Sequence, residues 1–206
     1  MPSSVTHSPS LWTIVLAAGA STRLGRPKQF VRFKAKSLLR RSVETAQALT
    51  PDQVVVVIGA NRQRMRSALH AFGGGVRVVD NARWEQGMST SLNAGLHALP
   101  RRATAALLLP VDQPLLNAFT LGPLIAAWER RPARPAAACY GGRLGVPAIL
   151  PRRLWTRAKS LRGDVGARDL LRRAGSRVTS VALPAARFDV DTTRDLAALY
   201  ALQLTI

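Results

Sequence analysis

Three short apolar runs constrain the fold of this 206-residue chain more than any other feature. Residues 11–15, 53–58 and 105–111 are almost entirely apolar and lack the alternation of apolar and polar side chains that marks a half-exposed strand. A strand without alternation is buried on both faces, which is typical of a parallel sheet covered by helices.

Amphipathic segments separate these runs. Residues 37–49 and 62–72 carry apolar side chains at helical spacing, and residues 76–79 are predicted to form a further strand. The alternation of strand and helix predicts an α/β fold with a doubly wound, mostly parallel sheet and helices on both faces, whose ligands bind beyond the carboxyl ends of the strands. The other predicted elements are helices at 117–130, 152–161, 169–174 and 195–203, strands at 178–183 and 187–190, and two strands within 136–150 joined through Gly141, Gly142 and Gly145.

Length and the first residues predict the domain organisation. At 206 residues the chain suits one well-buried domain, expected at 11–206. Residues 1–10 are polar and contain proline, without the pattern of a secretory signal, and are expected to form a flexible tail. Cys139 is the only cysteine and no apolar run approaches bilayer length, so we expect a cytoplasmic protein with no membrane partner.

The segment 16–28, LAAGASTRLGRPK, has the composition of a phosphate-binding loop. Small residues at 17–20 let backbone amides approach a ligand closely, and the hydroxyl and cationic residues that follow include Ser21, Thr22, Arg23 and Lys28. It is not a Walker A loop, because five residues separate Gly19 from Gly25, and not a dinucleotide fingerprint, because Ser21 stands where the second glycine belongs. An ordinary basic turn between strand and helix remains an alternative.

Acidic residues follow two later predicted strands. Asp112 comes directly after the run 105–111, and Asp191 follows the strand at 187–190. Carboxylates at this edge of a sheet face the ligand, and Mg²⁺ uses one or two carboxylates together with substrate phosphates. Asp189 shares a strand face with Asp191, so spacing does not exclude it as the ligand. Capping of the following helix is the alternative role for Asp112.

The loop at 16–28 resembles the signature LAAGxSxRMGxxK of the nucleotidyltransferases of the GT-A-like α/β class. Leu24 replaces the usual methionine, and the matching residues are Leu16, Ala17, Ala18, Gly19, Ser21, Arg23, Gly25 and Lys28.

Further stretches resemble, in the same order along the chain, motifs of one branch of this family, the MocA-like molybdenum cofactor cytidylyltransferases. They are W-x-x-G-M-S-x-S-L at Trp84, Gly87, Met88, Ser89, Ser91 and Leu92, the DQP motif at 112–114, G-x-P at Gly145 and Pro147, and G-D-x-G-A-R at Gly163, Asp164, Gly166, Ala167 and Arg168. The last motif along the chain is the terminal D-I-D-T-P-E-D-L at 189–196, in which Thr193 and Arg194 replace the usual Pro and Glu. Structural alternatives stay open: helix capping by Ser89, Thr90, Ser91 or Asp164, and a glycine-rich hairpin around Gly145.

The resemblance implies Mg²⁺-dependent transfer of CMP from CTP to the terminal phosphate of molybdopterin, with release of pyrophosphate and a recipient molybdoenzyme as a possible partner. The implied roles are catalytic for Arg23, Lys28 and Asp112, nucleotide-binding for Leu16, Ala17, Ala18, Gly19, Ser21, Arg23, Lys28, Gly87, Ser89 and Ser91, metal-binding for Asp112 and Asp191, and acceptor-binding for Gly145, Pro147, Asp164 and Arg168.

Other functions remain open at this stage. A guanylyltransferase or another nucleotidyltransferase acting on a different phosphate would share the first loop, although Ala18 belongs to the cytidine form of the motif. The net charge of +19 also raises a nucleic-acid-binding module. Because the arginines are scattered in pairs along the chain and lack interleaved aromatic residues, solvated helix faces are the favoured interpretation and no nucleic-acid partner is expected.

Overall fold

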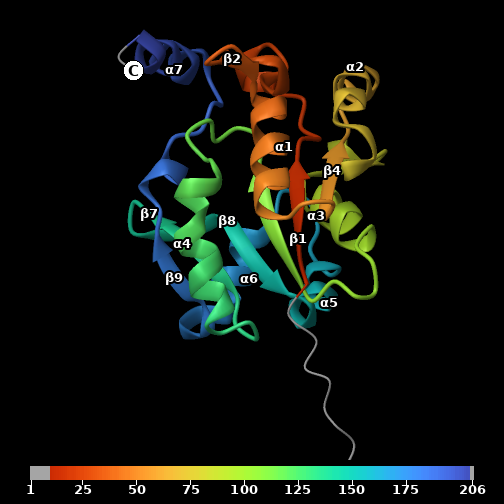
Figure 1. Cartoon of the computed structure of the whole chain (residues 1–206), viewed down its shortest axis with the longest axis vertical. Helices are drawn as coiled ribbons and strands as arrows, with labels where there is room; N and C mark the ends of the chain where they lie inside the picture. Colours follow the sequence, from red (N-terminus) through yellow and green to blue (C-terminus); the bar gives the residue numbers. More distant parts are fainter. Residues whose placement is uncertain (1–9, 205–206) are drawn as a thin grey trace, which may run out of the picture.

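A computed structural model describes residues 10–204; the tail expected at residues 1–10 lies outside this range except for Ser10. The central feature is a seven-stranded sheet (Figure 1) of order β5–β4–β1–β6–β8–β7–β9. β8 runs antiparallel to both of its neighbours, and the other strand pairs of this sheet are parallel. The predicted α/β class with a mostly parallel sheet is confirmed. The strands are β1 Leu11–Leu16, β4 Val54–Ile58, β5 Val76–Asp80, β6 Ala105–Pro110, β7 Ala136–Tyr140, β8 Arg143–Pro151 and β9 Thr179–Ala182.

Each central strand contributes side chains to two hydrophobic cores, one on each face of the sheet. In β4, Val54, Val56 and Ile58 belong to one core, whereas Val55 and Val57 belong to the other. All five side chains are at most 1% exposed. This is why the apolar runs lack alternation, since water reaches neither face of the strand.

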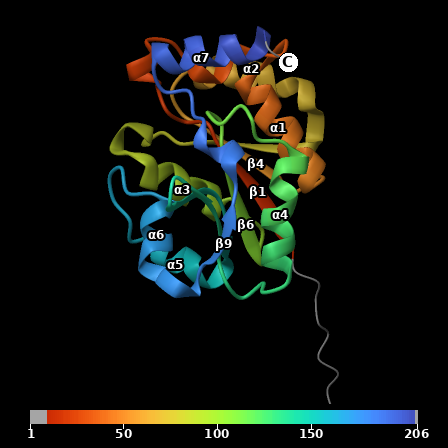
Figure 2. The same cartoon turned by 90° about the vertical axis from the view of Figure 1, so that its left-hand side faces the viewer.

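Helices cover both faces (Figure 2). The first core is covered mainly by α1 Leu38–Leu49 and α4 Ala118–Glu129, with contributions from α2 Arg62–Leu69 and α7 Thr193–Leu204. The second is covered by α3 Met88–His97, α5 Trp155–Ala158 and α6 Ala167–Ala174. None of the helices within residues 10–204 is long and apolar enough to cross a membrane.

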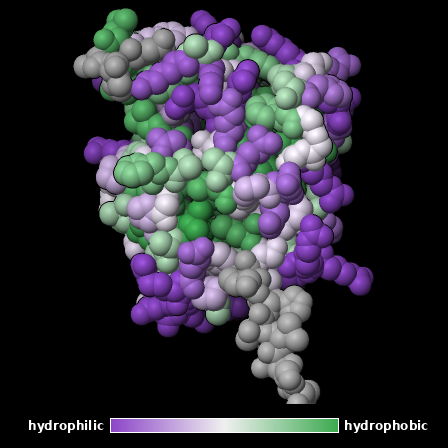
Figure 3. Space-filling model, in the orientation of Figure 1, coloured by the Kyte–Doolittle hydropathy of each residue, from purple (hydrophilic) through white to green (hydrophobic). Residues whose placement is uncertain are grey.

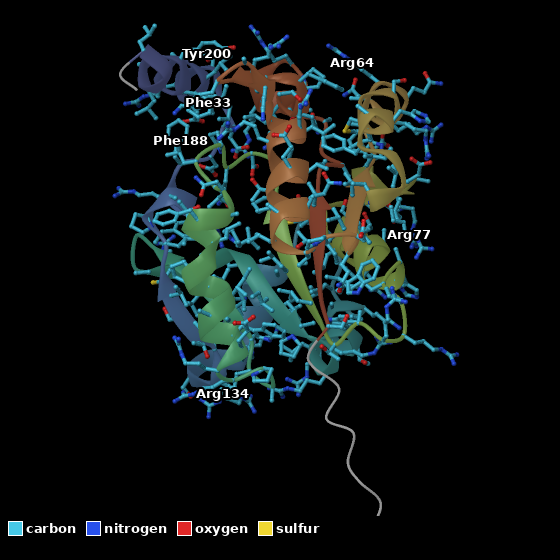
Figure 4. All side chains as sticks on the ribbon, in the orientation of Figure 1. Phe33, Arg64, Arg77, Arg134, Phe188 and Tyr200 are labelled. Carbon is cyan, nitrogen blue, oxygen red and sulfur yellow. The ribbon has the colours of Figure 1, made fainter. Side chains whose placement is uncertain are left out.

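A small hairpin, β2 Arg32–Phe33 with β3 Lys36–Ser37, leads into α1. Ser37 ends this hairpin and caps α1, because its Oγ accepts from the Arg40 amide at 3.2 Å. The hairpin lies beside α7, and Phe33, Phe188 and Tyr200 occupy this same region of the molecule (Figure 4). The chain thereby brings its last helix next to the segment that follows the phosphate loop.

Two predicted elements are wrong. The segment 187–190 is not a strand: Pro184–Arg187 forms a 3₁₀ turn, and Val190 makes a single backbone bond to the Asp112 carbonyl at 2.9 Å in place of a ladder. The helix expected at 152–161 is shorter: Arg152–Leu154 forms a 3₁₀ turn, and α5 covers only Trp155–Ala158.

The predicted capping of α3 by a hydroxyl residue is also wrong. Gly87 is the N-cap, with a φ of +101° that a side chain would resist, and Ser89 and Ser91 lie inside the helix, 2% and 7% exposed. The other helices begin close to their predicted positions, and α4 begins at an Asn117–Thr120 capping box.

The positive charge is dispersed over the surface. Arg64, Arg77 and Arg134 point outward from three separate parts of the molecule (Figure 4), and hydrophilic residues surround hydrophobic ones over much of the face in Figure 3.

Candidate active site

The phosphate-loop segment leaves β1 at the carboxyl edge of the sheet and is held there by a buried glutamine. The Gln29 side chain is fully buried, and its Nε2 donates to the Ala17 carbonyl at 2.7 Å and the Gly19 carbonyl at 2.8 Å. Further along, Ser21 adopts a left-handed conformation and its Oγ accepts from the Lys28 amide at 3.1 Å. These bonds fold the loop back on itself, so that its two ends meet.

One ammonium joins the two distant carboxylates. Lys28 Nζ lies 2.6 Å from Asp112 Oδ2 and 2.6 Å from Asp191 Oδ1. Burial lowers the pKa of Lys28, but the charges and hydrogen bonds of these two carboxylates outweigh burial and raise the pKa above its ordinary value. The loop lysine and the two carboxylates at the ends of separate chain segments thus converge at one point.

Arg23 joins the same group from the solvent side. Its Nη2 lies 2.9 Å from Asp191 Oδ2, and the arginine side chain is 72% exposed. An ion pair this exposed stabilises the fold little, so Arg23 remains free to turn toward an incoming anion.

Asp189 faces the same pocket without an ammonium of its own among the ion pairs of residues 10–204. Burial raises the pKa of Asp189, and the nearby charges of Asp112 and Asp191 raise it further. The site therefore holds more carboxylate than Lys28 alone neutralises.

A cavity of about 690 Å³ opens beside these residues, a size that accommodates a nucleotide together with a second substrate. Twelve of the residues assigned to the site from sequence line it: Leu16, Ala17, Ala18, Gly19, Ser21, Lys28, Gly87, Ser91, Asp112, Asp164, Arg168 and Asp191. Four do not line it: Arg23, Ser89, Gly145 and Pro147. Ser89 is buried, and its amide donates to the Gly163 carbonyl at 3.1 Å.

Tyr140 and Val146 form the pocket wall in front of Gly145 and Pro147. A Cβ on Gly145 would lie 2.5 Å from the Tyr140 hydroxyl, which donates to the Val146 carbonyl at 3.0 Å. The glycine therefore leaves room for the Tyr140 side chain beside β8, and Gly145 and Pro147 themselves lie outside the pocket lining.

Two motifs far apart in the chain pack together through glycines. A Cβ on Gly87 would lie 2.3 Å from the Gly163 carbonyl carbon, and one on Gly166 would lie 2.6 Å from Met88 Sδ. Segments 84–92 and 163–168 consequently form one continuous wall of the pocket. The capping alternatives are wrong: α4 is capped by Asn117 and not Asp112, and the N-cap of α6 is Gly166, without a side-chain cap.

Sequence reasoning missed Gln29, Gln113, Tyr140 and Glu85 as pocket residues. A buried glutamine leaves no periodic signal, because its role depends on which carbonyl groups the fold places around it. Glu85 precedes the Gly87 motif directly and could have been found by its position.

Comparison with known proteins identifies the family. Residues 13–178 match the family model described as the MobA-like NTP transferase domain. The chain belongs to this family. Its activity is accordingly nucleotidyl transfer from a nucleoside triphosphate (NTP), and its fold is the nucleotidyltransferase fold.

Two relatives similar in sequence carry different names. Nicotine blue oxidoreductase of Paenarthrobacter nicotinovorans is 34% identical over 178 residues, which are 81% of this chain and 84% of that protein. The bifunctional protein GlmU of Mycobacterium sp. strain KMS is 35% identical over 132 residues, 61% of this chain and 27% of GlmU, so the match spans about a quarter of that protein.

Two solved structures are similar to this chain over most of its length. The crystal structure of Rv0371c from Mycobacterium tuberculosis H37Rv gives a TM-score of 0.80 at 28% identity and covers 95% of this chain and 100% of that chain. A structure of Rv0371c in complex with manganese gives a TM-score of 0.74 at 27% identity, covering 94% and 98% of the two chains.

Asp112 and Asp191 are suited to bind a divalent metal whose remaining ligands come from the substrate and water. Residues 10–204 contain no group of three or more His, Cys, Asp and Glu side chains arranged to hold a metal unaided. Asp112 and Asp191, however, already direct one oxygen each at a common cation, Lys28 Nζ, and Asp189 adds negative charge beside them. Two carboxylates completed by phosphate oxygens and water are a typical set for Mg²⁺.

Proposed function

We propose that this MobA-like NTP transferase transfers CMP from CTP to the terminal phosphate of molybdopterin, with Mg²⁺ and release of pyrophosphate. The observation that carries the proposal is the convergence of Lys28 with Asp112 and Asp191 at the mouth of a nucleotide-sized cavity. Such a group combines fixed positive charge for phosphates with carboxylates for a metal.

The phosphate loop binds the triphosphate. Backbone amides near Gly19, freed from side-chain obstruction, approach the phosphates, and Arg23 and Lys28 neutralise the β- and γ-phosphates. Asp112 and Asp191 would hold the metal, which would supply positive charge to the reacting phosphates. The nucleotide-binding part of the pocket is completed by Leu16, Ala17, Ala18, Ser21, Gly87 and Ser91. Ser89 acts through the hydrogen bond from its amide to the Gly163 carbonyl and not by direct contact with the nucleotide.

The reaction exchanges one P–O bond for another. An oxygen of the acceptor phosphate attacks the α-phosphorus, the bond between the α-phosphorus and the α–β bridging oxygen breaks, and pyrophosphate leaves with both bonding electrons. The acceptor phosphate is already ionised near neutral pH, so no general base is needed. The protein contributes positioning and charge neutralisation.

The acceptor lies against the wall formed by segments 84–92 and 163–168. Arg168 presents a planar guanidinium suited to a phosphate, and Asp164 lies beside it in the lining. Gly145 and Pro147 support Tyr140 and Val146, which face the acceptor. The molybdenum cofactor assignment rests on the GMSTSL and GDVGAR motifs, and the choice of CTP on Ala18.

The test is incubation of the protein with molybdopterin, Mg²⁺ and each of CTP, GTP and ATP, with pyrophosphate as the readout. Release with CTP alone supports the proposal. Equal release with all three refutes the nucleotide assignment, and release only with another phosphate acceptor refutes molybdopterin. Asp112→Ala should abolish release without loss of fold, and an active variant would refute the metal role.

A second candidate function is oxidoreduction of nicotine blue. It is favoured by the 34% identity to nicotine blue oxidoreductase over 84% of that protein. The discriminating assay measures oxidation of NADH or NADPH in the presence of nicotine blue. Turnover there, without pyrophosphate release from any NTP, would favour this candidate over nucleotidyl transfer.

A further inference from the structure

We propose that Gln113 is a positioning residue that sets the separation of Asp112 and Asp191, and so the metal affinity of the site. The inference rests on the proposed function, because it assumes that these carboxylates hold the metal. It concerns a side chain that contacts neither the triphosphate loop nor Lys28 by any hydrogen bond described for residues 10–204.

Gln113 connects three segments that meet behind the carboxylates. Its side chain is buried, with 7% of the residue exposed, and its Nε2 donates to the Ala186 carbonyl at 2.8 Å and to the Val146 carbonyl at 3.3 Å. One amide group therefore joins the end of β6 to β8 and to the segment that carries Asp189 and Asp191.

This connection matters because the Asp191 segment has no ladder of its own. Residues 188–191 form neither helix nor strand, and the Val190 amide donates to the Asp112 carbonyl at 2.9 Å. Beyond them, Asp195 Oδ2 accepts from the Asp191 and Thr192 amides at 3.2 and 2.8 Å. The Gln113–Ala186 bond holds the chain on the N-terminal side of Asp189 and Asp191, and the Asp195 bonds hold it on the C-terminal side.

The chemistry of a primary amide suits this position. A single nitrogen carries two hydrogens, so it satisfies two carbonyl groups that face it from different segments. A carboxylate of the same shape would place negative charge against both carbonyls, and an apolar side chain would leave both buried acceptors without a donor.

Arg41 supports Gln113 from the opposite side. Its Nη2 donates to the Pro114 carbonyl at 3.0 Å, and it lines with Gln113 a small cavity of about 10 Å³. Gln113 Oε1 and Arg41 Nε are both buried without a hydrogen-bond partner in the described part of the chain. The cavity has room for one water molecule, which would accept from Arg41 Nε and donate to Gln113 Oε1 and so keep the amide nitrogen turned toward the carbonyls.

The test measures the binding of Mn²⁺ without nucleotide, by the electron paramagnetic resonance signal of the free ion. Gln113→Met keeps the length of the side chain and removes both donated bonds. We expect Mn²⁺ affinity to fall about tenfold, the lower end of the range for loss of a group that orients a metal ligand. We also expect kcat to fall while KM for the NTP changes little, because the phosphate loop is untouched.

The control is Trp155→Phe. Trp155 is also buried and its Nε1 donates to the Leu150 carbonyl at 3.1 Å, so the variant loses a comparable side-chain-to-backbone bond outside the pocket. Urea unfolding of both variants compares their stability. Mn²⁺ affinity should be unchanged in Trp155→Phe even if both variants lose similar stability.

A second variant covers the case in which Gln113→Met does not fold. Arg41→Met retains Gln113 but removes its support, and should weaken Mn²⁺ binding by about threefold, a smaller effect than direct loss of a ligand-orienting group. Wild-type affinity in a folded Gln113→Met, or in Arg41→Met when the first variant does not fold, overturns the inference alone. Failure of wild type to bind Mn²⁺ any better than Asp112→Asn overturns the proposed metal site, and the inference with it.

Discussion

Lys28 occupies the position between the carboxylates that a metal would share, and Lys28→Met tests this competition. Lys28 Nζ lies 2.6 Å from an oxygen of each carboxylate, and the side chains of Lys28, Asp112 and Asp191 are 14%, 22% and 26% exposed. A metal that binds Asp112 and Asp191 in the absence of nucleotide must displace the ammonium from both. Removing the ammonium should therefore strengthen binding of the metal alone.

The magnitude follows from the exposure of these ion pairs. A solvent-exposed pair contributes up to about 1 kcal/mol, and breaking a fully buried pair costs about 3–5 kcal/mol. For two half-screened contacts we take about 2 kcal/mol in total, discounted for solvent access. At about 1.4 kcal/mol per factor of ten, Lys28→Met should bind Mn²⁺ about 30-fold more tightly than wild type.

The assay is an Mn²⁺ titration without nucleotide, followed by pyrophosphate release with CTP. Turnover should fall in Lys28→Met despite the tighter metal, since the β- and γ-phosphates lose their buried cation. Lys36→Met is the matched control, because Lys36 pairs with Glu44 on the surface at 2.8 Å and its loss removes the same charge. Unchanged or weaker Mn²⁺ binding in Lys28→Met would refute the competition.

The remaining predictions concern pH, packing and charge. Burial raises the pKa of Glu44, but hydrogen bonds from Arg40 and Lys36 outweigh burial and lower the pKa below the ordinary 4.5. The stabilisation of the fold by these contacts is therefore present above pH 4.5 and is lost as the pH falls through the lowered pKa. Glu44→Gln should cost about 0.5 kcal/mol at pH 7 in urea unfolding, and an equal cost in strong acid would contradict this. Gly87→Ala should lower the free energy of unfolding by more than about 2 kcal/mol and loosen the pocket wall at 84–92, because Gly87 has a φ of +101° and Gly163 occupies the space that a Cβ would need. An unfolding midpoint equal to that of wild type would show that segments 84–92 and 163–168 can separate freely. Because the chain carries a net charge of +19, kcat/KM for an NTP should fall as NaCl is added, and a flat salt profile would exclude steering.

Most of the strands could be predicted because their signals are local. Apolar runs without alternation arise wherever a strand is covered on both faces, and glycine and alanine are required wherever a backbone approaches a ligand. The wrong prediction of a strand at 187–190 arises because the conformation of this segment depends on contacts with a distant part of the chain. Phe188 and Val190 are apolar in sequence because they pack under the site, yet the single bond from Val190 to Asp112 is decided by the neighbouring segment.

The helix caps show the same limit. A hydroxyl residue near Gly87 is a reasonable N-cap by composition, but the contact of Gly87 with Gly163, more than seventy residues later in the sequence, fixes that helix start. Tyr140 likewise became a pocket residue only because Gly145 leaves room for its ring. Packing between distant segments carries no periodic signal in either segment.

By itself the sequence determined the fold class, and it singled out the loop at 16–28 with Lys28, Asp112 and Asp191 as candidate site residues, because each depends on residue chemistry and on which end of a strand the residue follows. Only the tertiary structure decided that Lys28 lies between both carboxylates, that Asp189 shares their pocket, and that Gln113 and Gln29 hold the segments around them. The physical reason is that a buried hydrogen bond or ion pair depends on the distance between groups far apart in the chain. That distance is set by the packing of the whole sheet and its two layers of helices.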